Sequence, residues 1–160
     1  MVNGEEVLLG FFAVIAGVFF LFLLIMVLMY IFYGIGMFKI AKTLGRSDWA
    51  FLAWIPIAQV FLMPILIEED VHESLRGKFT LIFAIVWISS FVLSLFFAIF
   101  GFLSLIIQIY AFHVLATRFS ENALVHTIIA IVTLGISMPI SLFLFRNRDP
   151  LPQQGVEVLD

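Results

Sequence analysis

The chain has 160 residues, of which 64% are hydrophobic and 12% are charged, and its formal net charge at pH 7 is -3. Soluble domains carry about a quarter charged residues, so this composition excludes an ordinary soluble protein. The absence of cysteine excludes disulfides, thiolate catalysis and cysteine-based metal centres, and no basic run is present that would bind nucleic acid. The length leaves no room for a second domain, so we expect one transmembrane domain over residues 1–148.

Uncharged apolar runs fill most of that domain and predict its helices. A helix needs about 20 apolar residues to cross the hydrocarbon core of a bilayer, and each run meets or nearly meets that length. The fold class expected is therefore all-α, a polytopic transmembrane helical bundle in which five helices are preferred. The expected spans are 7–38, 49–67, 79–99, 101–117 and 122–145.

The first run, 7–38, is longer than one crossing requires, so its end is expected to extend into the interface. Glu5 and Glu6 precede it where a signal peptide would carry positive charge, which favours an uncleaved first span. Gly45 is the expected stop of this helix, and Ser47 or Asp48 the expected cap of the next one.

The second run, 49–67, contains Pro56 and Pro64, each of which removes a backbone donor and predicts a structural kink. The carbonyls freed at a kink need partners inside the protein, because lipid supplies none. We expect Gln59 to cap such a carbonyl rather than to contact a ligand. If this segment is instead re-entrant, or if the third run is one long helix, the chain crosses three or four times.

In the last run, 122–145, a third structural kink is expected at Pro139.

The third run, 79–117, is long enough for nearly 60 Å of helix, which one crossing cannot use. A tight hairpin around 100–102, where Gly101 permits a turn, is favoured over one long tilted helix.

The positions of lysine and arginine test these arrangements, because both residues accumulate in cytoplasmic loops. Five crossings with an external N-terminus place three basic residues outside, namely Arg76, Lys78 and Arg118, and five inside. Three crossings give seven inside and one outside. The lengths of the apolar runs favour five crossings, whereas the distribution of basic residues favours three. Both arrangements place the loop 39–48 and the C-terminus in the cytoplasm. The Pro-bearing tail, 149–160, is expected to be short and mobile.

Polar side chains within the apolar runs are the candidate functional residues, because burying a polar group in hydrocarbon is costly. Ser104 and Gln108 follow helical spacing, which predicts a polar face toward the bundle interior. The candidate intramembrane polar face consists of Gln59, Ser94, Ser104, Gln108 and His113. Such a face would line a small-solute or ion pathway, although serines of this kind more often bond to their own helix or to a neighbour.

Ionisable residues are densest in the segment 68–73, which contains four acids and His72. These groups could bind a divalent cation, but their spacing fits no established site, and a solvated boundary of the membrane is the favoured interpretation. No nucleotide-binding or metalloprotease signature is present. We therefore expect no enzymatic activity, no catalytic or metal-binding residue and no cofactor.

The segment Phe51-Leu-Ala-Trp-Ile-Pro-Ile-Ala-Gln-Val-Phe-Leu62, preceded by Lys39-Ile-Ala-Lys-Thr-Leu-Gly45, resembles a group of small uncharacterised prokaryotic membrane proteins. That group has a (Trp/Phe)-Leu-Ala-x-Ile-Pro-Ile-Ala-(Asn/Gln) segment, and similar modules occur fused to signal peptidases. The chain departs from it at Phe51 and Gln59, where tryptophan and asparagine are usual, and in its acidic loop. The resemblance implies a compact multi-helix module in a prokaryotic inner membrane, without an activity.

These features favour a structural or accessory subunit that works by helix packing in the lipid bilayer. Its expected partner is another membrane protein or a second copy of the chain. The alternative function is the small-solute or ion pathway described above.

Overall fold

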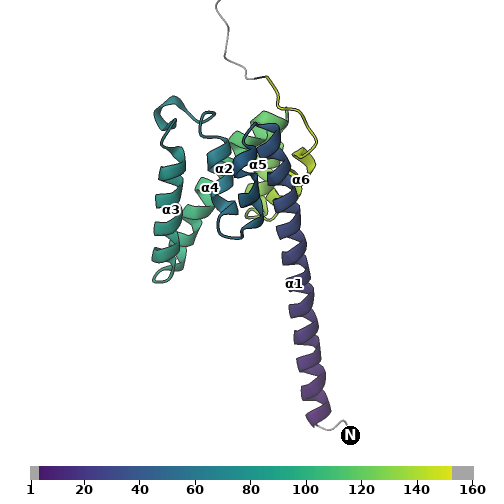
Figure 1. The fold of residues 1–160 in the computed structure, drawn as a ribbon. Helices are drawn as coiled ribbons and strands as arrows, with labels where there is room; N and C mark the ends of the chain where they lie inside the picture. The colour runs from purple at the N-terminus through teal and green to yellow at the C-terminus, as the bar shows by residue number, and fades with distance from the viewer. Residues whose placement is uncertain (1–3, 153–160) are drawn as a thin grey trace, which may run out of the picture.

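A computed structural model describes residues 4–152, and in that part of the chain every regular element is helical (Figure 1). The all-α prediction is therefore confirmed. The elements are α1 (Gly4–Thr43), η1 (Ser47–Trp54), α2 (Gln59–Leu66), η2 (Glu73–Leu75), α3 (Phe79–Ser94), η3 (Ala98–Phe100), α4 (Gly101–Phe119), α5 (Ala123–Val132) and α6 (Met138–Phe145).

Helix α1 has 40 residues and is about 60 Å long at 1.5 Å per residue. Its first part, to Leu28, is exposed and projects away from the bundle, whereas its last part packs against η1 and α6 (Figure 1). The helix stops at Gly45 as predicted, where φ is 73° and the amides of Gly45 and Arg46 bond back to the helix. The cap predicted at Ser47 or Asp48 is wrong, because no side chain bonds the first turn of η1.

The second apolar run forms two short helices, η1 and α2, rather than one kinked helix. Pro56 lies in the turn between them, so it ends a helix instead of bending one, because its ring and missing N–H suit a turn better than a helix interior. Pro64 does lie inside α2. Gln59 is the first residue of α2, and the hydroxyl of Tyr33 donates to its backbone carbonyl at 3.3 Å.

The third run folds as a hairpin of α3 and α4, as favoured from its length. The turn spans Leu95 to Phe100, earlier than predicted, and Gly101 begins α4 with an ordinary helical φ of -58°. No residue from Leu95 to Gly101 has a positive φ, so this turn does not require glycine.

The run 122–145 was expected to be one span, and the structure corrects this prediction. A turn at Thr133–Ser137 separates α5 from α6, with Leu134 and Gly135 at φ values of 51° and 87°. Pro139 lies in the first turn of α6, where a missing N–H has no helical acceptor to lose, so it starts a helix rather than kinking one.

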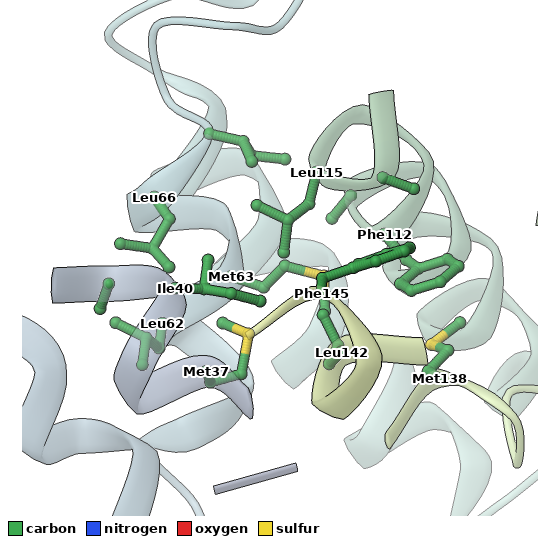
Figure 2. Packing of buried hydrophobic residues seen from close by; sticks show 14 of the residues in the cluster. Met37, Ile40, Leu62, Met63, Leu66, Phe112, Leu115, Met138, Leu142 and Phe145 are labelled. Carbon is green, nitrogen blue, oxygen red and sulfur yellow. The ribbon is translucent and has the colours of Figure 1, made fainter. Parts of the chain in front are cut away.

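The core lies where the last part of α1 meets α2, α4 and α6 (Figure 2). Gly36 lets α1 approach α6 so closely that a Cβ at this position would lie 2.8 Å from the Leu142 carbonyl oxygen. The Phe145 ring stacks against Phe112 and Phe119, with centroid distances of 6.5 and 6.4 Å. This packing positions the polar loops at one end of the bundle.

Two helices in the described part of the chain are long and apolar enough to cross a membrane, Gly4–Thr43 and Ala98–Phe119. Helices α3 and α5 are apolar but shorter. Five crossings therefore remain a prediction.

Candidate functional site

The serines of the predicted polar face bond within their own helices. Ser94 Oγ donates to the Phe91 carbonyl and Ser104 Oγ to the Gly101 carbonyl, both at 2.7 Å. Such bonds satisfy a hydroxyl in an apolar environment without a ligand. Both serines therefore have a local structural role in the hairpin of α3 and α4.

His113 connects two helices. Its Nδ1 lies 2.8 Å from Thr127 Oγ1, which in turn donates to the Ala123 carbonyl at 2.9 Å. His126 makes the corresponding link between α5 and α6, with Nδ1 3.2 Å from Ser141 Oγ. These two histidines join α4, α5 and α6 through polar contacts inside an otherwise apolar bundle.

Gln59 and Gln108 complete the predicted face. The side-chain oxygen of Gln59 is buried and has no hydrogen-bond partner among the described residues, and Gln108 is half-buried in α4. No hydrogen bond in the described part of the chain joins one of the five predicted residues to another. The sequence therefore identified the polar residues but not a common site.

Glu68 is the N-terminal cap of α3. Its carboxylate accepts the backbone N–H of Phe79 at 2.9 Å and that of Thr80 at 2.7 Å, and it also accepts the Thr80 hydroxyl. Negative charge is favourable at a helix N-terminus, where backbone N–H groups have no helical acceptor. This acid therefore stabilises α3.

Asp70 and Arg118 form an ion pair between the loop after α2 and the end of α4. Arg118 Nε donates to Asp70 Oδ2 at 2.7 Å, and a second guanidinium nitrogen contacts the other carboxylate oxygen. The side chain of Asp70 is 6% exposed and that of Arg118 is 25% exposed. Because the two residues are 48 positions apart, no local sequence pattern indicates this pair.

A second, exposed ion pair joins Arg46 to Glu69 at 2.9 Å. Three acids of the segment 68–73 thus have structural partners, and no group of three metal-binding side chains occurs in residues 4–152. These contacts give the acids structural roles, and the interpretation of this segment as a solvated boundary of the membrane stays a prediction.

The polar loops meet at one end of the bundle, which we call the charged end and define as residues 39–48, 67–78, 118–122 and 146–152. The amide of Leu151 donates to the Arg118 carbonyl at 2.7 Å, and Lys39 Nζ donates to Asn147 Oδ1 at 3.2 Å. The predicted mobile tail, 149–160, is therefore bonded to the bundle at its third residue, Leu151, and its part from 153 onward lies outside the described residues. An open cavity of about 280 Å³ at this end is lined by Thr43, Leu44, Arg46, Leu66, Glu69, Asp70, Arg118 and Pro150.

The two arginines and two acids at this cavity neutralise one another, which suits a rigid junction of loops more than the binding of a charged ligand.

Comparison of the chain with protein-family models, with curated proteins and with solved structures finds no match. The resemblance carried by residues 39–62 therefore stays a prediction.

Proposed function

We propose that this chain is an integral membrane protein that serves as a structural or accessory subunit, packing the first part of α1 against another membrane protein. The observation that carries the proposal is the exposure of this part. From Gly4 to Leu28 every side chain is exposed, and no other described segment of the chain lies beside it (Figure 1).

The last part of α1 indicates how this helix packs. At Gly34 a Cβ would lie 3.1 Å from the Trp54 ring, and at Gly36 it would lie within 3 Å of the α6 backbone. Small residues allow the backbones of membrane helices to approach and gain van der Waals contact, the main source of helix association in lipid. Glycine in α1 thus coincides with close helix contact.

Gly10, Ala13 and Gly17 repeat this feature in the exposed part. Their spacing of three and four residues places them on one face of the helix, and a Cβ at either glycine would meet nothing within 4 Å. A helix of a partner protein can approach this face as α6 approaches Gly36. We call residues Gly10, Ala13 and Gly17 the small face of α1.

The alternative function, a small-solute or ion pathway, has less support. The hydroxyls of Ser94 and Ser104 donate hydrogen bonds to backbone carbonyls three residues earlier in the chain, and His113 is bonded to Thr127. A pathway needs polar groups that remain free to replace the hydration of the solute. Three of the five residues of the predicted face are therefore not free for a solute, and the packing role is preferred.

Site-specific photo-cross-linking in native membranes tests the packing role. We expect a photoreactive phenylalanine analogue at Leu21, which continues the small face, to give a discrete protein adduct. The same analogue at Phe19, on the opposite face, is the matched control and should give none. The mass of the adduct distinguishes a second copy from another protein, and absence of a protein adduct from Leu21 would contradict the proposal.

A further inference from the structure

We infer that α1 alone crosses the bilayer, and that the other helices form three hairpins that enter the hydrocarbon from the cytoplasmic side and turn back within it. The hairpins are η1 with α2, α3 with α4, and α5 with α6. This inference rests on the proposed membrane location. It adds that the bundle enters the lipid from the cytoplasmic side and does not cross to the other side.

The first argument is the distribution of charge. Hydrogen bonds and ion pairs join the end of α1, the loop after α2, the end of α4 and the segment after α6, so these charged segments share one end of the bundle. The turns of the three hairpins, 55–58, 95–100 and 133–137, contain no charged residue. In Figure 1 the turn between α3 and α4 points to the same side as the exposed part of α1, away from the charged end.

The second argument is what the turns expose. Phe96 is 75% exposed, Ile57 is 72% exposed and Ile136 is 66% exposed, and the turn at 95–100 consists of apolar residues alone. A turn that crossed the bilayer and emerged in water would have to hydrate these side chains, which is unfavourable in proportion to their area. Contact with hydrocarbon removes this cost.

The third argument is the backbone of the turns, because lipid cannot bond a free N–H group. Every N–H from Thr133 to Met138 has an acceptor in the turn or in α5, including the Ser137 amide, which donates to Thr133 Oγ1 at 3.2 Å. In the turn of α3 and α4, the amides of Leu95, Phe96, Phe97 and Phe100 are likewise bonded. Near the first hairpin, Tyr30 Oη donates to the Trp54 carbonyl at 2.6 Å. The turn at 133–137 is therefore bonded as a lipid environment requires, whereas the amides of Ile57, Ala58, Ala98 and Ile99 have no acceptor among the described residues.

Helix length supplies the fourth argument. Helices α2, α5 and α6 have 8, 10 and 8 residues, which corresponds to about 12–15 Å, half of the roughly 30 Å core. Helix α3, with 16 residues, reaches about 24 Å, which limits the depth of the turn that it shares with α4, although Ala98–Phe119 is itself long enough to cross. The uncharged stretch of α1, from Val7 to Phe38, exceeds the core thickness on its own.

This arrangement also agrees best with the positive-inside rule. It places all eight lysine and arginine residues on one side, whereas five crossings give a ratio of five to three and three crossings a ratio of seven to one. The charged end therefore faces the cytoplasm, and Glu5 and Glu6 lie on the other side of the membrane.

Cysteine accessibility tests this inference, because the chain has no cysteine of its own. Single variants Glu5→Cys, Ser74→Cys, Ala98→Cys and Ile136→Cys are treated with a membrane-impermeant maleimide in intact cells, in inside-out vesicles and in detergent. We expect Glu5→Cys to react in intact cells but not in inside-out vesicles, and Ser74→Cys in inside-out vesicles but not in intact cells. Both should react in detergent, and the two turn variants should react in detergent alone.

Reaction of Ala98→Cys or Ile136→Cys in intact cells would mean that a hairpin crosses, and would overturn the inference. Reaction of either in inside-out vesicles as fast as Ser74→Cys would overturn it too, because the turns would then lie in water. Retention of each variant in carbonate-washed membranes shows separately that the chain is integral. The labelling pattern is independent of the adduct at Leu21, so failure of the topology and failure of the packing role are distinguishable.

Discussion

Replacing Gly36 by alanine should lower the free energy of unfolding by about 1–3 kcal/mol, the usual cost of overpacking a well-packed contact. The new Cβ would lie 2.7 Å from the Leu142 carbonyl carbon and 2.9 Å from the Phe143 nitrogen. Both are backbone atoms, which cannot rotate away, so α1 and α6 have to separate. The thermal midpoint of the protein in a mild detergent measures this loss.

Gly4→Ala is the matched control for this variant, since it makes the same change in the same helix and lies outside the small face. Nothing lies within 4 Å of a Cβ at Gly4, and alanine favours a helix over glycine by up to about 1 kcal/mol. The thermal midpoint of Gly4→Ala should therefore equal or exceed that of the wild type. Equal midpoints for Gly36→Ala and the wild type would contradict the close contact of α1 with α6.

Removing the carboxylate of Asp70 should have the largest effect of any single change at the charged end. In Asp70→Ala the Arg118 guanidinium loses both contacts while remaining largely buried, and breaking a buried pair from one side costs about 3–5 kcal/mol. The same thermal measurement in detergent applies. Glu69→Ala is the control, because its pair with Arg46 is exposed and is worth about 1 kcal/mol or less.

A double variant separates the ion pair from the loop that carries it. Asp70→Ala combined with Arg118→Met removes both charges, so no unpaired charge is left buried, and it should be more stable than Asp70→Ala alone. If the double variant is less stable than Asp70→Ala, the loss of stability in Asp70→Ala does not come from leaving the Arg118 charge buried without its partner.

The sequence predicts those features of the fold that depend on neighbouring residues alone. The stop at Gly45 needs only a residue that accepts positive φ, and the hairpin in the third run follows from a length that one crossing cannot use. The sequence does not predict the division of 122–145 because Thr133, Gly135 and Ser137 stand singly among apolar residues, so the run reads as one continuous apolar span. Pro56 and Pro139 were assigned kinks, although proline is equally suited to turns and helix starts.

The candidate site was less predictable because its contacts depend on tertiary structure. Helical spacing indicated that Ser104 and Gln108 share a side of α4, but not that Ser104 bonds to its own helix. The acids at 68–73 suggested a cation site from composition alone. Their partners, the N-terminus of α3 and Arg118, are brought to them only by the packing of the bundle.

The mass of the complex extracted in mild detergent tests most directly that this protein works by packing the small face of α1. We predict that the wild type is recovered in a particle larger than one chain of 18.2 kDa, plus detergent. We predict that Gly17→Leu, which covers that face with a bulky side chain, is recovered as a single chain that still unfolds in one cooperative thermal transition. Recovery of the wild type as a single chain in several gentle detergents, or an intact complex in Gly17→Leu, would contradict the proposal.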